Sequence, residues 1–342
     1  MTGSGVRFSA AWRHPRVRLA SAGAISALVL ALAVPAATAA PAFGGPAVTG
    51  TITVGSGPAS VAVNSSSGTI YVTNSTSGTV SVINGQNNRV VATIHVGTAP
   101  EGVAVNSATD TVYVANNGSG TVSVINGGTN AVTATITVGS HPTGVALNSA
   151  TNTLYVSNTS SGTVSVINAL TNAVTATITG LNHPTGMAVN SSVKTKTLYV
   201  ANDGGNTVSV INTKTNLVTA AITVGTHPNA VVINTVTSTV DVANNGSGTV
   251  SLINGATNTV TGTVTVGTGP DGLAVNPVQG TTYVTNNGGG SVSVISGFGG
   301  AVTATVTVGT GPDGVAVSTV DGTVYVANSG GTTVSVISGT LL

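Results

Sequence analysis

The chain has 342 residues and no cysteine, and its charged residues make up only 4% of the total, against about 25% in an ordinary globular domain. The absence of cysteine excludes a disulfide framework and the lipid-bearing cysteine of a bacterial lipoprotein. Valine and threonine favour strands, whereas glycine and asparagine favour turns. Because these four residue types recur along most of the sequence, we expect an all-β protein of many short strands.

The first 39 residues have the three parts of a secretory signal peptide. Arginines stand at positions 7, 13, 16 and 18, an apolar stretch covers 19–34, and small residues suited to cleavage occupy 35–42. The apolar stretch is short for a bilayer span of about 20 residues, which favours cleavage near Ala39 or Ala40 over a membrane anchor. We therefore expect a secreted or cell-envelope protein, with a short linker at 40–47 before a folded domain at 48–342.

Removal of the signal peptide changes the sign of the net charge. The remaining chain keeps Arg89, Lys194, Lys196 and Lys214 against seven acidic residues, a net charge of −3. A nucleic-acid-binding protein needs a basic surface for the phosphates, and none is expected here. No second long apolar stretch predicts a membrane span.

One strand motif recurs seven times at intervals of 42 residues, with a single interval of 44. Each repeat holds four strand-like segments, such as 102–105, 111–116, 121–126 and 131–139, separated by turn-forming residues. Four strands in every 40–45 residues predict a seven-bladed β-propeller of four-stranded antiparallel blades. The motif places an aromatic residue at Tyr71, Tyr113, Tyr155, Tyr199, Tyr283 and Tyr325, with Asp241 in the fifth copy, and ends each copy with Asn74, Asn116, Asn158, Asn202, Asn244, Asn286 or Asn328.

The ends of the repeat array predict how the ring closes. The last repeat stops after its third strand, 333–338, and an unaccompanied fourth-type strand precedes the first repeat at 48–54. We expect these two strands to pair and complete the seventh blade.

The fourth strand of each repeat predicts the outer rim. In 131–139, Val132, Ala134, Ile136 and Val138 alternate with threonines, which is typical of a half-buried strand. Lysine residues that usually protect an exposed edge are almost absent. Weak self-association through these edges is therefore a hypothesis.

Two copies of the motif, at 71–74 and 283–286, read Tyr-Val-Thr-Asn, and the other copies are close variants. Residues 48–342 therefore resemble the YVTN-repeat family of seven-bladed propellers, which includes YncE-like exported proteins and archaeal surface-layer proteins. The resemblance implies the fold and says little about function, because the motif residues are structural. Asp241 departs from the pattern and suggests a looser fifth repeat. The repeated asparagine is expected to begin a hairpin turn, since asparagine tolerates the left-handed conformation.

Chemistry is expected where the repeats differ, in the loops between the fourth strand of one repeat and the first strand of the next. The residue before the loop proline is histidine in three successive repeats, at His141, His183 and His227. The residue after that proline is acidic at Glu101, Asp271 and Asp313. Three histidines at one channel mouth could bind zinc or copper, and an acid opposite them could act as a base on a bound water. The simpler interpretation is that these are ordinary turn sequences shared by duplication.

The interpretation that we favour is a non-catalytic binding or scaffold module for protein or carbohydrate, with no cofactor expected. The alternative is a metal-dependent lyase or lactonase acting at the channel mouth. Some seven-bladed lyases and lactonases work there, but none of their motifs matches this sequence residue by residue. Only a convergent set of histidines would favour the enzyme.

Overall fold

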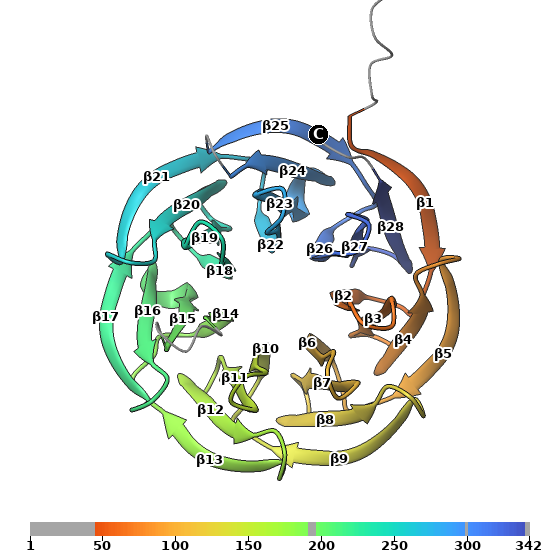
Figure 1. Cartoon of the computed structure of the whole chain (residues 1–342), viewed down its shortest axis with the longest axis horizontal. Coiled ribbons are helices and arrows are strands. Elements are labelled where there is room, and N and C mark those ends of the chain that lie inside the picture. Colours follow the sequence, from red (N-terminus) through yellow and green to blue (C-terminus); the bar gives the residue numbers. More distant parts are fainter. Residues whose placement is uncertain (1–44, 191–195, 298–299, 339–342) are drawn as a thin grey trace, which may run out of the picture. The chain divides into compact units, whose positions relative to one another are not determined.

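The computed structural model describes residues 45–190, 196–297 and 300–338. Within them, 28 strands form seven antiparallel sheets of four strands each, and these sheets stand as blades around a ring (Figure 1). The predicted all-β, seven-bladed propeller is confirmed. The predicted signal peptide, the linker residues 40–44 and Lys194 lie outside the described residues.

We number the blades 1 to 7 in chain order and describe their strands from the axis outward. The innermost strands are β2 (Pro58–Asn64), β6 (Pro100–Asn106), β10 (Pro142–Asn148), β14 (Pro184–Val189), β18 (Pro228–Asn234), β22 (Pro270–Asn276) and β26 (Pro312–Val317). The second strands are β3 (Thr69–Asn74), β7 (Thr111–Asn116), β11 (Thr153–Asn158), β15 (Thr197–Asn202), β19 (Thr239–Asn244), β23 (Thr281–Asn286) and β27 (Val324–Asn328). The third strands are β4 (Thr79–Asn84), β8 (Thr121–Asn126), β12 (Thr163–Asn168), β16 (Thr207–Asn212), β20 (Thr249–Asn254), β24 (Ser291–Ser296) and β28 (Thr333–Ser338). The outer strands are β5 (Arg89–His95), β9 (Ala131–Thr137), β13 (Ala173–Ile178), β17 (Leu217–Thr223), β21 (Thr259–Thr265), β25 (Ala301–Thr307) and β1 (Ala47–Thr53), and the short 3-10 turns are η1 (Asp203–Gly205) and η2 (Asn287–Gly289).

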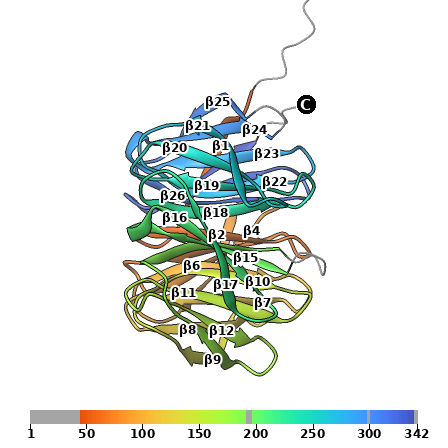
Figure 2. The same ribbon diagram turned by 90° about the vertical axis from the view of Figure 1, so that its left-hand side faces the viewer.

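Strands from the two ends of the repeat array close the ring. Strand β1 pairs antiparallel with β28, with Thr51 opposite Ser335 and Thr53 opposite Thr333, so blade 7 has the order β1-β28-β27-β26. The predicted closure is confirmed, and β1 begins at Ala47 rather than Val48. The view of the ring from its edge places β17 in front of the inner strands of its blade (Figure 2).

Apolar side chains fill the spaces between neighbouring blades. Tyr71, Val80 and Val82 of blade 1 pack against Val112 and Val114 of blade 2, and all five are at most 2% exposed. Both faces of the second and third strands are therefore buried, as the near-continuous apolar sequence of these strands predicts. The buried apolar residues of the blades contribute to the positive mean hydropathy of the chain, +0.42. Among the described residues, no helix has the length and apolar character to cross a bilayer.

The repeated asparagine precedes the turn that joins the second and third strands, as predicted. Asn202 and Asn286 have negative φ values of −111° and −107°, so only the expectation of a left-handed conformation is wrong. Asn158 is fully buried; its Nδ2 donates to Thr163 Oγ1 (3.1 Å) and Ser165 Oγ (2.9 Å), and its Oδ1 accepts from the Gly139 amide (3.1 Å). The side chain thus ties the second strand to the third strand and to the loop that enters its own blade from the preceding one.

The outer strands follow the predicted alternation only along half of their length. In β9, Ile136 is buried, but Val132 is 38% exposed. The register shifts between Val124 and Ile125 on the partner strand β8, and this bulge turns the first residues of β9 outward. The predicted alternation of buried and exposed residues is therefore wrong at Val132.

The fifth blade is not looser than the others. Strand β19 pairs with β20 in the same register that the second and third strands of the other blades use. Asp241 is only 5% exposed and accepts a hydrogen bond of 2.6 Å from Thr282 Oγ1 of blade 6. Burial raises the pKa of the Asp241 carboxyl, and the bond from Thr282 opposes that rise. Thr282 stands where the other blades have an apolar residue, so the two departures from the repeat compensate each other.

Candidate functional site

The innermost strand of every blade carries a β-bulge directly after its proline. In blade 2, Pro100 pairs with Asn116 and the next pair is Val103 with Val114, so Glu101 and Gly102 together lie opposite Ala115. The same register shift follows the proline in each of the other six blades. In a bulge, two residues of one strand lie opposite a single residue of its partner, and this changes the direction in which a side chain points. We call the first residue of each bulge the channel residue.

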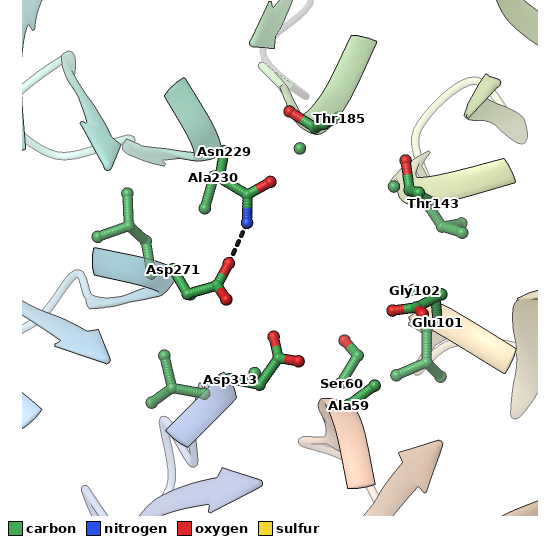
Figure 3. Close-up of a pocket in the computed structure, with 18 of the residues that line it drawn as sticks. Ala59, Ser60, Glu101, Gly102, Thr143, Thr185, Asn229, Ala230, Asp271 and Asp313 are labelled. Atoms are coloured by element: carbon green, nitrogen blue, oxygen red, sulfur yellow. Dashed lines mark hydrogen bonds between the residues drawn. The ribbon is translucent and has the colours of Figure 1, made fainter. Parts of the chain in front are cut away.

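The seven channel residues line one cavity on the axis of the ring, with a volume of about 360 Å³ (Figure 3). Its size is typical of small-ligand sites. The residues two positions further along the same strands form an apolar ring beside them. The channel residues are Ala59, Glu101, Thr143, Thr185, Asn229, Asp271 and Asp313, and the apolar ring is Val61, Val103, Val145, Met187, Val231, Leu273 and Val315.

Three carboxylates converge on one side of this cavity. The side chains of Glu101, Asp271 and Asp313 point into it from blades 2, 6 and 7 (Figure 3). Asn229 Nδ2 donates a hydrogen bond to Asp271 Oδ1. No lysine, arginine or histidine lines the cavity, so within the described part of the chain no basic side chain neutralises these acids at the axis.

The position of the carboxylates raises their pKa values. Burial, and then the charge of Asp271, raises the pKa of Glu101 to about 6. Burial also raises the pKa of Asp271, although the hydrogen bond from Asn229 opposes this. The pKa of Asp313 lies well above its ordinary value because of burial and the charges of Asp271 and Glu101. Without a cation, the group therefore holds protons at a pH where isolated carboxyls have lost them.

The opposite side of the cavity is uncharged. Thr143 and Thr185 are the channel residues of blades 3 and 4. Thr143 Oγ1 lies 2.8 Å from Thr159 Oγ1, and Thr185 Oγ1 donates to the Pro228 carbonyl oxygen at 3.3 Å. Both hydroxyls already have hydrogen-bond partners in the wall of the ring. The acidic side therefore carries most of the polar character of the cavity.

The structure brings the predicted acids together but not the predicted histidines. His141, His183 and His227 are exposed and do not line the axial cavity. His227 instead pairs with Asp203, with 3.0 Å between Nδ1 and Oδ1. Each histidine has a positive φ, between 49° and 52°, in the tight turn before the proline. Among residues 45–190, 196–297 and 300–338, no three His, Cys, Asp or Glu side chains are arranged to hold a metal ion. Zinc or copper binding by these histidines stays a prediction without support from this geometry.

Sequence comparison of the seven loops identified Glu101, Asp271 and Asp313 but missed Asn229, which shares their position and bonds to Asp271. The signal that could have found it is the repeat register, since Asn229 follows the loop proline of blade 5. The small residues Ser60, Gly102 and Ala230 beside the channel residues were also missed. A Cβ at Gly102 would meet the carbonyl oxygen of Thr143 in the next blade, so this position lets neighbouring blades approach at the axis.

No protein-family model matches the chain, and no curated protein matches it in sequence. Among solved structures, it is similar to a chain of the hydrazine synthase of Kuenenia stuttgartiensis, with a TM-score of 0.76 and 20% sequence identity. The similarity covers 83% of this chain and 96% of that one. At this level of identity the comparison shows a shared propeller fold.

Proposed function

We propose that this protein is an exported, non-catalytic binding module that takes a positively charged organic group into the axial cavity. The group would be an amine or guanidinium, carried by a small molecule or by a protein or carbohydrate of the cell envelope. The observation that carries this proposal is the convergence of Glu101, Asp271 and Asp313 in a cavity that no basic residue lines.

An organic cation can pair with the three carboxylates without requiring them to adopt a strict arrangement. An ammonium group donates up to three hydrogen bonds and can be shared by several carboxylates. The neighbouring apolar ring, which includes Val61, Val103 and Met187, suits the methylene groups that carry such an ammonium. A metal ion would need several ligand atoms at coordination distance, and no three His, Cys, Asp or Glu side chains among the described residues are placed to provide them.

The raised pKa values give the proposed binding a definite pH dependence. Carboxyls that hold protons attract a cation weakly, so affinity should rise as pH increases through the pKa of Glu101, about 6. Cation binding should in turn release protons from the cavity.

The test is calorimetric titration of the purified protein with 1,4-diaminobutane at pH 5 and pH 8, with the uncharged 1,4-butanediol as a control ligand. We expect binding of the diamine that strengthens by about tenfold or more between the two pH values, as the loss of cavity protons requires. The triple variant Glu101→Gln, Asp271→Asn, Asp313→Asn should bind at least about 100-fold more weakly, because buried charge pairs contribute several kcal/mol when one partner is removed.

A matched control variant is Asp203→Asn, which removes one carboxylate that does not line the axial cavity. It should bind the diamine as the unmodified protein does. Equal binding by the triple variant, or equal binding of diamine and diol, would refute the proposal.

The alternative of a metal-dependent lyase or lactonase has less support. It needs histidines that converge at the channel mouth, and His141, His183 and His227 are instead exposed and outside the cavity. Metal analysis after zinc and copper loading, beside a triple His→Ala variant, tests this alternative directly. Stoichiometric metal that the variant loses would restore it.

A further inference from the structure

We infer that Thr285 and Thr73 position the cavity carboxylates by joining the bulges of neighbouring blades, and this inference rests on the proposed function. These two residues are the threonines of the two Tyr-Val-Thr-Asn copies. Each belongs to the second strand of its blade and stands opposite the bulge. Each side chain is fully buried, with 0% exposure.

The hydroxyl of Thr285 bonds to both acid-bearing bulges beside it. Thr285 Oγ1 accepts a hydrogen bond of 2.7 Å from the Gly272 amide, which follows Asp271 in blade 6. The same oxygen donates at 2.5 Å to the carbonyl oxygen of Asp313 in blade 7. One hydroxyl thus fixes the backbone at two neighbouring acids whose charges repel each other.

Thr73 makes the same bridge between blades 1 and 2. Its Oγ1 accepts from the Ser60 amide at 2.9 Å and donates to the Glu101 carbonyl oxygen at 2.6 Å. Ser157 forms a third bridge, where no carboxylate is present. Its Oγ accepts from the Gly144 amide at 2.8 Å and donates to the Thr185 carbonyl oxygen at 2.6 Å. The remaining blades have alanine at this position: Ala115, Ala201, Ala243 and Ala327.

The blades that have a hydroxyl opposite the bulge, and those that do not, show that this hydroxyl positions the bulge and is not required for folding. Four blades form their bulges with alanine opposite them, so the hydroxyl is dispensable for the blade itself. Two of the three hydroxyls, those of Thr285 and Thr73, donate to the backbone of an acidic channel residue. Because like charges at short distance favour separation, an acid-bearing bulge gains most from a bond that fixes its backbone.

The experiment compares Thr285→Ala, Thr285→Ser and the matched control Ser157→Ala, all confirmed as folded by circular dichroism. Asp and Glu number only seven in the chain, so their carboxyl ¹³C signals can be assigned and titrated individually without any ligand. In Thr285→Ala, the released bulges should separate the charges and admit water. We then expect the pKa of Asp313 to fall by about one unit, and diamine affinity at pH 8 to fall about tenfold, because the variant loses both hydrogen bonds that join the two acid-bearing bulges.

Thr285→Ser should keep the titration and affinity of the unmodified protein, and Ser157→Ala should change neither. Thr73→Ala is the second test, and it should shift the titration of Glu101 in the same direction. An Asp313 titration that is unchanged in Thr285→Ala, or an equal effect of Ser157→Ala, would overturn the inference. If the unmodified protein fails to bind the diamine while Thr285→Ala still shifts Asp313, the positioning stands and the proposed function fails.

Discussion

The second strands of the blades and the channel residues differ in how strictly they repeat. The second strand ends in asparagine in all seven blades, and each of these asparagines is at most 3% exposed. The channel position lies nearby on the innermost strand of the same blade. Its residue is alanine, glutamate, threonine, asparagine or aspartate. The difference teaches that the constant residues hold the ring together, whereas the residues at its axis can vary without changing the fold. Variants in the two regions should therefore affect different measurements.

The largest effect is expected from Asn158→Ala in the constant region. It removes three hydrogen bonds and leaves the Gly139 amide and two hydroxyls without their partner, which should lower the free energy of unfolding by about 3 kcal/mol. Denaturant unfolding monitored by circular dichroism measures this loss.

Asn126→Ala is the control for this variant. Asn126 ends the third strand of blade 2, but it is exposed and accepts only from the Thr129 amide, so the cost should stay below about 1 kcal/mol. Diamine affinity should survive both changes, and a loss of affinity in Asn158→Ala would contradict the separation of the two regions.

The repeat explains why the sequence predicts the constant region well and the variable region only in part. A period of 42 residues and the alternation of turns and apolar segments determine strand number, blade number and ring closure. The loop prolines also identify Glu101, Asp271 and Asp313 as equivalent positions. The repeat could not predict that these side chains point into the cavity, because their direction depends on the bulge after each proline. The left-handed backbone before the proline leaves His141, His183 and His227 in solvent. The bridge from Thr285 to Asp313 depends on how two blades face each other, which no local pattern records.

An intermediate effect is expected from pH, through Glu101 in the variable region. Folding raises the pKa of this carboxyl from 4.5 to about 6, so the folded state holds the proton more tightly than the unfolded state. Stability should therefore be greatest below pH 4.5 and should fall as pH rises to 6, with a contribution of about 2 kcal/mol from this group. Asp271 and Asp313, whose pKa values are also raised, act in the same direction.

Unfolding at several pH values between 4 and 8 measures this dependence, with Glu101→Gln as the comparison. The variant should equal the unmodified protein near pH 4 and should exceed it in stability at pH 8. Saturating diamine should remove most of the difference, because a bound cation compensates the charges. Equal stability of the two proteins at every pH would show that Glu101 is fully solvated, which would weaken the case for a site at the axis.

The smallest effect is expected from His141→Gly, at the turn just outside the cavity. His141 has a φ of 52°, and the equivalent residues Gly57, Gly269 and Gly311 have φ between 59° and 64°. A residue with a Cβ is strained in this conformation by about 1 kcal/mol, and glycine relieves the strain but gives the unfolded chain more freedom. The net gain should be about 0.5 kcal/mol, measured as a small rise in the denaturant midpoint. Diamine affinity should not change, because this side chain is exposed and does not line the cavity. If affinity instead fell with His141→Gly, the histidines would belong to the site, and the boundary between the ligand-binding axis and its supporting turns would have to include the residue before each proline.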